Sequence, residues 1–141
     1  MVVRRLSLMF GVLFAAGAGV MAQQPAETGS SGGDVERGRY LVERVIMCGE
    51  CHSTRGPDGG IVVGTRLKGG PMPVQSPFRS ADWPLQIPRI AGLPGYTDAE
   101  ATRLLTEGAI KRDGTQARMP MPRFRMTPED AAAVIAYLRT Q

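Results

Sequence analysis

Three chemically reactive side chains lie within five consecutive residues of this chain. Cys48 and Cys51 are its two cysteines and His52 is its one histidine, in the order Cys-x-x-Cys-His. Positions i, i+3 and i+4 share one face of a helix, so two thiols and one imidazole can reach the same bound group. This pattern constrains the fold more than any other feature, because the rest of the chain has to enclose whatever these residues hold.

The pattern is the attachment motif of a c-type haem. Each thiol adds to one vinyl group of the porphyrin, and His52 is then held under the iron as an axial ligand. Three alternatives fit less well. A thioredoxin-type Cys48–Cys51 disulfide lacks its βαβ context, a structural zinc ion needs a fourth ligand, and inert buried cysteines leave the histidine unexplained.

The second axial ligand of the iron has to be a residue other than histidine, or the position is vacant, because His52 is the sole histidine. A methionine thioether suits haem iron and raises its potential. Met47 adjoins Cys48, and Met126 fits the start of a helix as half of a hydrophobic staple. Met72 lies in a Gly/Pro loop that could approach the haem, so it is a weaker candidate for the ligand. The segment Met119-Pro120-Met121-Pro122 is predicted to form an extended strap that supplies the ligand, and spacing alone does not choose between its two methionines.

The chain divides into three parts. Residues 1–22 are predicted to be a secretory signal peptide, with Arg4 and Arg5 before an uncharged run and Val20-Met21-Ala22 at the cleavage site. An uncleaved membrane anchor is the alternative, but the run from Leu6 to Val20 is shorter than the ~20 residues that span a bilayer. Residues 23–33 are predicted to be a flexible linker, and residues 34–141 one folded domain.

Charge argues against nucleic acid as a partner. The chain has 17 basic and 13 acidic residues and an isoelectric point near 9.6. Loss of residues 1–22 removes Arg4 and Arg5 and leaves 15 basic and 13 acidic residues, a net charge of +2. At this low net charge, the mature protein has little electrostatic attraction for nucleic acid. Without its signal, it also has no apolar stretch left that could span a membrane.

Helix signals predict an all-α domain with three main helices. The first runs from Val35 to about Met47 behind Asp34 as N-cap, and carries the haem motif at its C-terminal end. The second begins at the capping box formed by Thr97 and Glu100 and stops at Gly108. The third begins at Thr127-Pro128 and ends the chain. The 18 glycines and 11 prolines concentrate in long loops, above all between residues 56 and 88.

With these parts in place, the chain resembles the class I c-type cytochromes, in particular the single-domain periplasmic cytochromes that accompany bacterial dehydrogenases and oxidases. The resemblance covers nearly all of residues 34–141. The matching segments are Arg37-Gly38-Arg39-Tyr40-Leu41-Val42, Cys48 to Arg55, Ile90 to Thr97, Leu104 to Gly108, Met121 to Thr127 and Ala136 to Arg139.

The resemblance implies a small cytochrome c fold, with three main helices around one covalent haem. In that family the axial methionine stands in Met-Pro-x-Phe/Tyr before the last helix, which matches Met121-Pro122-Arg123-Phe124 and assigns Met121 rather than Met119. The first and last helices of the family cross closely, and Gly38 and Tyr137 match the crossing positions. Candidates for hydrogen bonds to the haem propionates are Arg89, Trp83 and Tyr96.

The function that the resemblance implies is electron transfer in the periplasm, with no catalytic residues. Electrons would pass from a dehydrogenase or other donor to a terminal oxidase or other cytochrome. Three alternatives stay open: a haem enzyme or ligand sensor with a vacant or labile sixth position, a haem subunit that docks on a dehydrogenase, and a membrane-associated form with an uncleaved signal.

Overall fold

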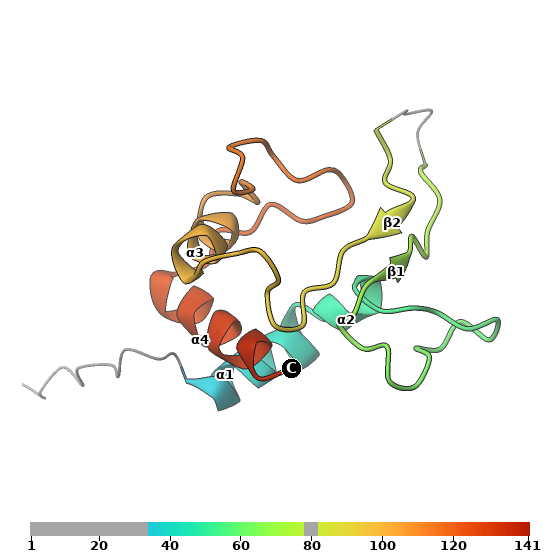
Figure 1. The fold of residues 1–141 in the computed structure, drawn as a ribbon, viewed down its shortest axis with the longest axis horizontal. Coiled ribbons are helices and arrows are strands. Elements are labelled where there is room, and N and C mark those ends of the chain that lie inside the picture. The colour runs from blue at the N-terminus through green and yellow to red at the C-terminus, as the bar shows by residue number, and fades with distance from the viewer. Residues whose placement is uncertain (1–33, 78–81) are drawn as a thin grey trace, which may run out of the picture.

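The computed structural model of the protein describes residues 34–77 and 82–141, so the expected signal peptide and linker lie outside the described residues. Helices predominate, and the only paired strands in the described part are very short (Figure 1). This confirms the expected fold class. The elements in chain order are α1 (Val35–Tyr40), η1 (Leu41–Val45), α2 (Cys48–Cys51), β1 (Gly70–Pro71), β2 (Gln86–Ile87), α3 (Asp98–Thr106) and α4 (Pro128–Arg139).

The first expected helix differs from its prediction. Asp34 caps α1 by accepting a 3.0 Å hydrogen bond from the Arg37 amide, but from Leu41 the helix widens into the π-helical turn η1. The Ile46 amide donates to the Leu41 carbonyl at 2.8 Å, a spacing of five residues. Met47 then adopts a left-handed conformation with φ 55°, which ends the helix. The haem motif therefore lies on a separate helix, α2, rather than at the end of the first helix.

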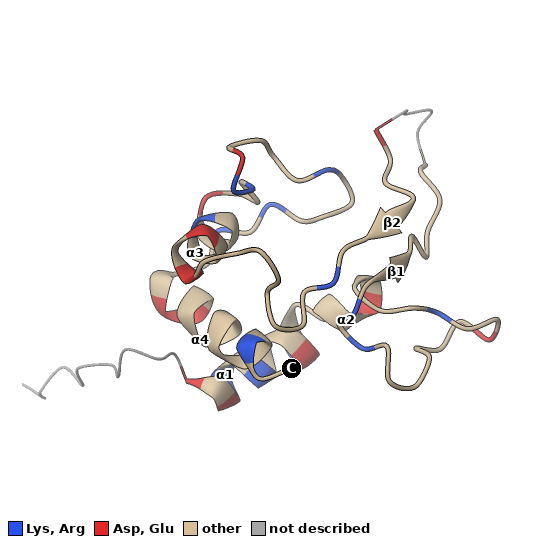
Figure 2. Cartoon of the chain, in the orientation of Figure 1, with Lys and Arg blue, Asp and Glu red and all other residues tan. Residues whose placement is uncertain are grey.

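The other two helices begin where their capping residues predict. At α3, Thr97 and Glu100 form both hydrogen bonds of the capping box. At α4, the Thr127 hydroxyl accepts from the Asp130 amide and Pro128 occupies the first turn. Acidic residues in the first turns and Arg139 in the last turn of α4 complement the helix dipoles (Figure 2). Both predictions are confirmed.

Helices α1 and α4 cross at Gly38, as the sequence predicts. A Cβ atom built on Gly38 would lie 1.9 Å from the carbonyl oxygen of Ala133 and 2.8 Å from Cβ of Tyr137. No side chain fits in this space, so the absence of a Cβ lets the two helices pack backbone against backbone. The crossing places η1 beside the last helix, with Leu41 and Val42 buried in the core, and α2 contacts η1.

We expect Gly38→Ala to destabilise the protein by about 2–3 kcal/mol, because the added methyl forces α1 away from α4. Chemical denaturation of the parent and the variant measures this difference. Arg39→Ala, one residue on in the same helix and exposed, serves as the control and should cost less than about 0.5 kcal/mol. Equal stability of Gly38→Ala and the parent would contradict the close crossing.

The long loop between α2 and α3 folds back on itself. Its two strands pair antiparallel, with Gly70 opposite Ile87 and Pro71 opposite Gln86. The sequence contains no alternating pattern for these strands, since each is only two residues long. Their pairing brings the segment that precedes Arg89 against the segment that follows α2 (Figure 1). Within residues 34–77 and 82–141, no helix has both the length and the apolar character needed to cross a lipid bilayer.

Candidate haem site

The Cys-x-x-Cys-His motif forms one tight turn. Helix α2 contains both cysteines, and His52 follows as its C-cap, with its amide donating to the Cys48 carbonyl at 2.9 Å. Cys48 is half-buried and Cys51 is exposed, and both are free thiols. Burial raises the pKa of the Cys48 thiol to about 11, so this thiol stays protonated at neutral pH. The turn thus presents one half-buried, protonated thiol at Cys48 and one accessible thiol at Cys51 for covalent attachment.

The imidazole of His52 is fixed in one tautomer. Its side chain lies in the interior, with only 7% of the residue exposed, and Nδ1 lies 2.8 Å from the carbonyl oxygen of Pro88. A carbonyl oxygen only accepts hydrogen bonds, so Nδ1 carries the proton and Nε2 keeps its lone pair for a metal ion. Burial lowers the pKa of His52, against the opposing effect of this hydrogen bond, and so favours the neutral ring.

Backbone contacts hold the segment around His52. The Gly69 amide donates to the His52 carbonyl at 2.9 Å, and the Thr54 hydroxyl donates to the Gly69 carbonyl at 3.1 Å. Gly69 has φ 80°, and a Cβ there would lie 2.5 Å from the Ile87 carbonyl oxygen. Only glycine tolerates both conditions, so Gly69 allows the chain before Pro88 to approach His52.

Ser53 adds a second support that the sequence analysis missed. Its fully buried hydroxyl donates to the Gly49 carbonyl at 2.6 Å and accepts from the Leu67 amide at 3.1 Å. Pro88 and Gly69 were likewise not predicted from the sequence. Pro88 acts through a backbone carbonyl, which leaves no side-chain signal, whereas the Gly69-Gly70 pair indicates only a turn.

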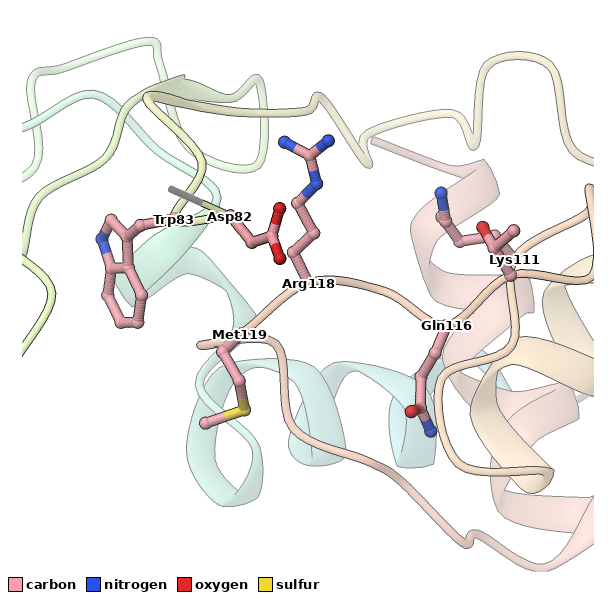
Figure 3. Close-up of a pocket in the computed structure, with 7 residues that line it drawn as sticks. Asp82, Trp83, Lys111, Gln116, Arg118 and Met119 are labelled. Carbon is pink, nitrogen blue, oxygen red and sulfur yellow. The ribbon is translucent and has the colours of Figure 1, made fainter. Parts of the chain in front are cut away.

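A hollow of about 510 Å³ lies between the loop that follows α3 and the chain that leads into β2 (Figure 3). Its volume falls within the range of roughly 300–1,000 Å³ that small-molecule sites occupy. Trp83 and Met119 supply aromatic and thioether surface, while Lys111 and Arg118 supply positive charge. Asp82 adds a negative charge to the same lining, and Cys48, Cys51 and His52 are not among the residues that line the hollow. The chain from Trp83 also continues to Pro88, whose carbonyl holds His52.

The attachment turn, the oriented histidine and this hollow can be compared with known proteins. The sequence model of cytochrome c matches residues 35–141. The chain belongs to the cytochrome c family. Cytochromes c bind haem c covalently and transfer electrons through it, and Cys48, Cys51 and His52 fit the haem-binding motif. The fold, the cofactor and the role as electron carrier expected from the sequence are confirmed.

One curated relative of this cytochrome c is the fructose dehydrogenase cytochrome subunit of Gluconobacter japonicus. The two sequences are 30% identical over 138 residues, which cover 94% of this chain. This chain spans 27% of the length of that relative. Among residues 34–77 and 82–141, no cluster of three or more His, Cys, Asp or Glu side chains is arranged to hold a metal ion.

The methionines of this cytochrome c lie in different surroundings. Met119 is 58% exposed and lines the hollow, while Met121 is half-buried two residues further on. Met126 packs against the core, as the staple interpretation predicts. Met47 is exposed next to the attachment turn, and Met72 is half-buried in the long loop. The assignment of Met121 as axial ligand therefore stays a prediction.

The three candidates for propionate binding differ in how far their polar groups are already used. The Trp83 indole donates to the Val74 carbonyl at 3.0 Å, and Arg89 Nε donates to the Ala91 carbonyl at 2.8 Å. Tyr96 packs half-buried against the core. Trp83 thus lines the hollow with its ring, while its N–H group stabilises the loop.

Proposed function

We propose that this cytochrome c is an exported, periplasmic carrier of single electrons that holds one haem c with histidine and methionine as axial ligands. The observation that carries the proposal is the hydrogen bond from His52 Nδ1 to the Pro88 carbonyl, because it leaves Nε2 free and aimed by a fixed, buried ring. When bound, the haem supplies a one-electron couple between ferric and ferrous iron.

Each residue of the site has a distinct part in this proposal. The thiols of Cys48 and Cys51 would hold the haem covalently, each by adding its S–H across the double bond of one vinyl group. His52 Nε2 and the Met121 sulfur would be the two protein ligands of the iron. A thioether is a soft, neutral ligand that favours ferrous iron, so this pair keeps the potential high enough for electron transfer.

The proposed partners are a dehydrogenase as electron donor and a terminal oxidase or another cytochrome as acceptor. The similarity to the cytochrome subunit of fructose dehydrogenase supports a donor of the dehydrogenase kind. The signal-like residues 1–22 support export to the periplasm, with membrane association if this segment is not cleaved. A pull-down with the purified, haem-loaded protein tests the donor directly.

We expect His52→Ala to lose the low-spin spectrum of the parent, because the chain has no second histidine to replace the ligand. The absorption spectrum of the purified ferric protein, recorded beside Thr54→Ala as a control next to the motif, measures this. Thr54→Ala removes one loop hydrogen bond and should keep the low-spin spectrum. A His52→Ala protein with the parent spectrum would contradict the ligation.

A further inference from the structure

A polar network links the last helix to the turn that carries the cysteines. The Tyr137 hydroxyl donates to Glu43 Oε1 at 3.0 Å, and the Arg66 guanidinium donates to the other oxygen of the same carboxylate. Glu43 lies on the π-helical turn η1, and its side chain is only 16% exposed. Both oxygens of Glu43 are therefore engaged, one by α4 and one by the long loop that follows α2.

The far side of this network lies against Gly49. A Cβ built on Gly49 would lie 3.1 Å from Arg66 Cζ and 3.3 Å from each of its two terminal nitrogens. These near-equal distances show that the plane of the guanidinium faces the Gly49 backbone. Gly49 lies between Cys48 and Cys51, and its carbonyl accepts the Ser53 hydroxyl. The attachment turn is thus held by Ser53 through its carbonyl and covered by Arg66.

The network differs from the surface ion pairs of this protein. Arg39 pairs with Glu36 within one helix, and the two side chains are 55% and 75% exposed. Exposed pairs of this kind contribute little, typically 0–1 kcal/mol. In the Arg66–Glu43 pair, the Arg66 side chain is 42% exposed but the Glu43 carboxylate is shielded and also accepts a hydrogen bond from Tyr137, so loss of Arg66 would leave a carboxylate short of its partner. The planar fork of arginine fits this position, whereas the ammonium of lysine is a point charge.

We propose that Arg66, oriented by Glu43 and Tyr137, is a positioning residue for the haem-attachment turn. It fixes helix α2, and through α2 it fixes the backbone from which His52 reaches the iron. The inference rests on the proposed function, because it takes Cys48, Cys51 and His52 as the residues that hold the haem. It assigns the π-helical turn a purpose, since the turn carries Glu43 to the junction of α4 and the long loop.

The test compares haem-loaded Arg66→Gln, Arg66→Lys, Glu43→Gln and Arg39→Gln with the parent. Arg39→Gln is the matched control. Arg39 carries the same charge as Arg66, and both line a second surface hollow, distinct from the one beside Trp83. Hydrogen exchange of residues 47–52 reports the order of the turn, and the ferric low-spin electron paramagnetic resonance signal reports the orientation of the axial ligands. Thermal melting verifies that each variant is folded.

We expect Arg66→Gln and Glu43→Gln to speed exchange at residues 47–52 by about tenfold, which corresponds to an opening free energy lower by about 1.4 kcal/mol. Both should also shift or broaden the resonance signal, Arg66→Lys should not restore it, and Arg39→Gln should match the parent. Parent-like exchange and resonance in folded Arg66→Gln would overturn the inference, and so would full rescue by lysine. A parent protein without covalent haem would instead refute the proposed function.

Gly49→Leu gives an independent test, because it displaces the Arg66 side chain from the turn while the positive charge of Arg66 is kept. A leucine side chain cannot share the space in which the guanidinium lies. If contact with the turn matters, folded Gly49→Leu shows the same faster exchange and altered resonance signal as Arg66→Gln. Parent-like values in this variant would overturn the inference.

Discussion

Replacement of both Cys48 and Cys51 by alanine is expected to give a haem-free protein that does not fold cooperatively. The core formed by the protein alone is small. The largest fully buried side chains in the described residues are Leu67, Val42, Val134 and Ser53, and five of the buried hydrophobic residues are alanines. A bound group that stabilises only the folded state adds several kcal/mol, and this contribution would be lost.

Circular dichroism and thermal melting of the double variant measure this effect. Cys51→Ala alone is the control, because Cys48 still allows one thioether and the haem is retained in that variant. The control should therefore melt cooperatively at a lower temperature than the parent. A haem-free double variant with the cooperative melting of the parent would contradict the dependence of the fold on haem.

The second large effect is expected at the axial methionine. Met121→Ala should abolish the ferric absorption band near the red end of the visible spectrum that marks a methionine–iron bond, and should lower the reduction potential substantially. Met119→Ala should keep the band and cost at most about 1–3 kcal/mol of stability. The two residues are matched, since they lie two positions apart in the same strap and each precedes a proline.

A shift of the strap could let one methionine replace the other, so the double variant Met119→Ala, Met121→Ala completes the test. It should lose the band entirely. The reverse pattern in the single variants would move the ligand to Met119, and a band that persists in the double variant would assign it to Met72. Absence of the band from the parent would instead favour a haem enzyme or ligand sensor with a vacant sixth position.

Sequence reasoning succeeds here where local chemistry decides. The capping residues Thr97 and Thr127 place the starts of α3 and α4 correctly, because a side-chain oxygen and a backbone amide three residues on are enough to begin a helix. Gly38 is a good predictor of the helix crossing for a similar reason. An interior glycine weakens a helix, so its presence indicates that another element approaches closely.

Long-range packing sets what the sequence does not reveal. Residues 35–47 have the pattern of one continuous helix, but contacts of Glu43 with α4 and the long loop accompany a π-helical turn, and Met47 turns the chain left-handed before Cys48. Pro88 supports His52 with a backbone carbonyl that any residue has. Such features depend on contacts between residues 23 to 94 positions apart, so no local pattern predicts them.

The mass of the purified, fully denatured protein tests the central claim most directly. Thioether bonds survive unfolding, whereas a haem held only by its iron ligands is released. The account predicts that each chain is heavier than its polypeptide by one haem, and that digestion places this mass on the peptide that contains Cys48 and Cys51. A chain of bare polypeptide mass, from cells that attach haem to other cytochromes c, would contradict it.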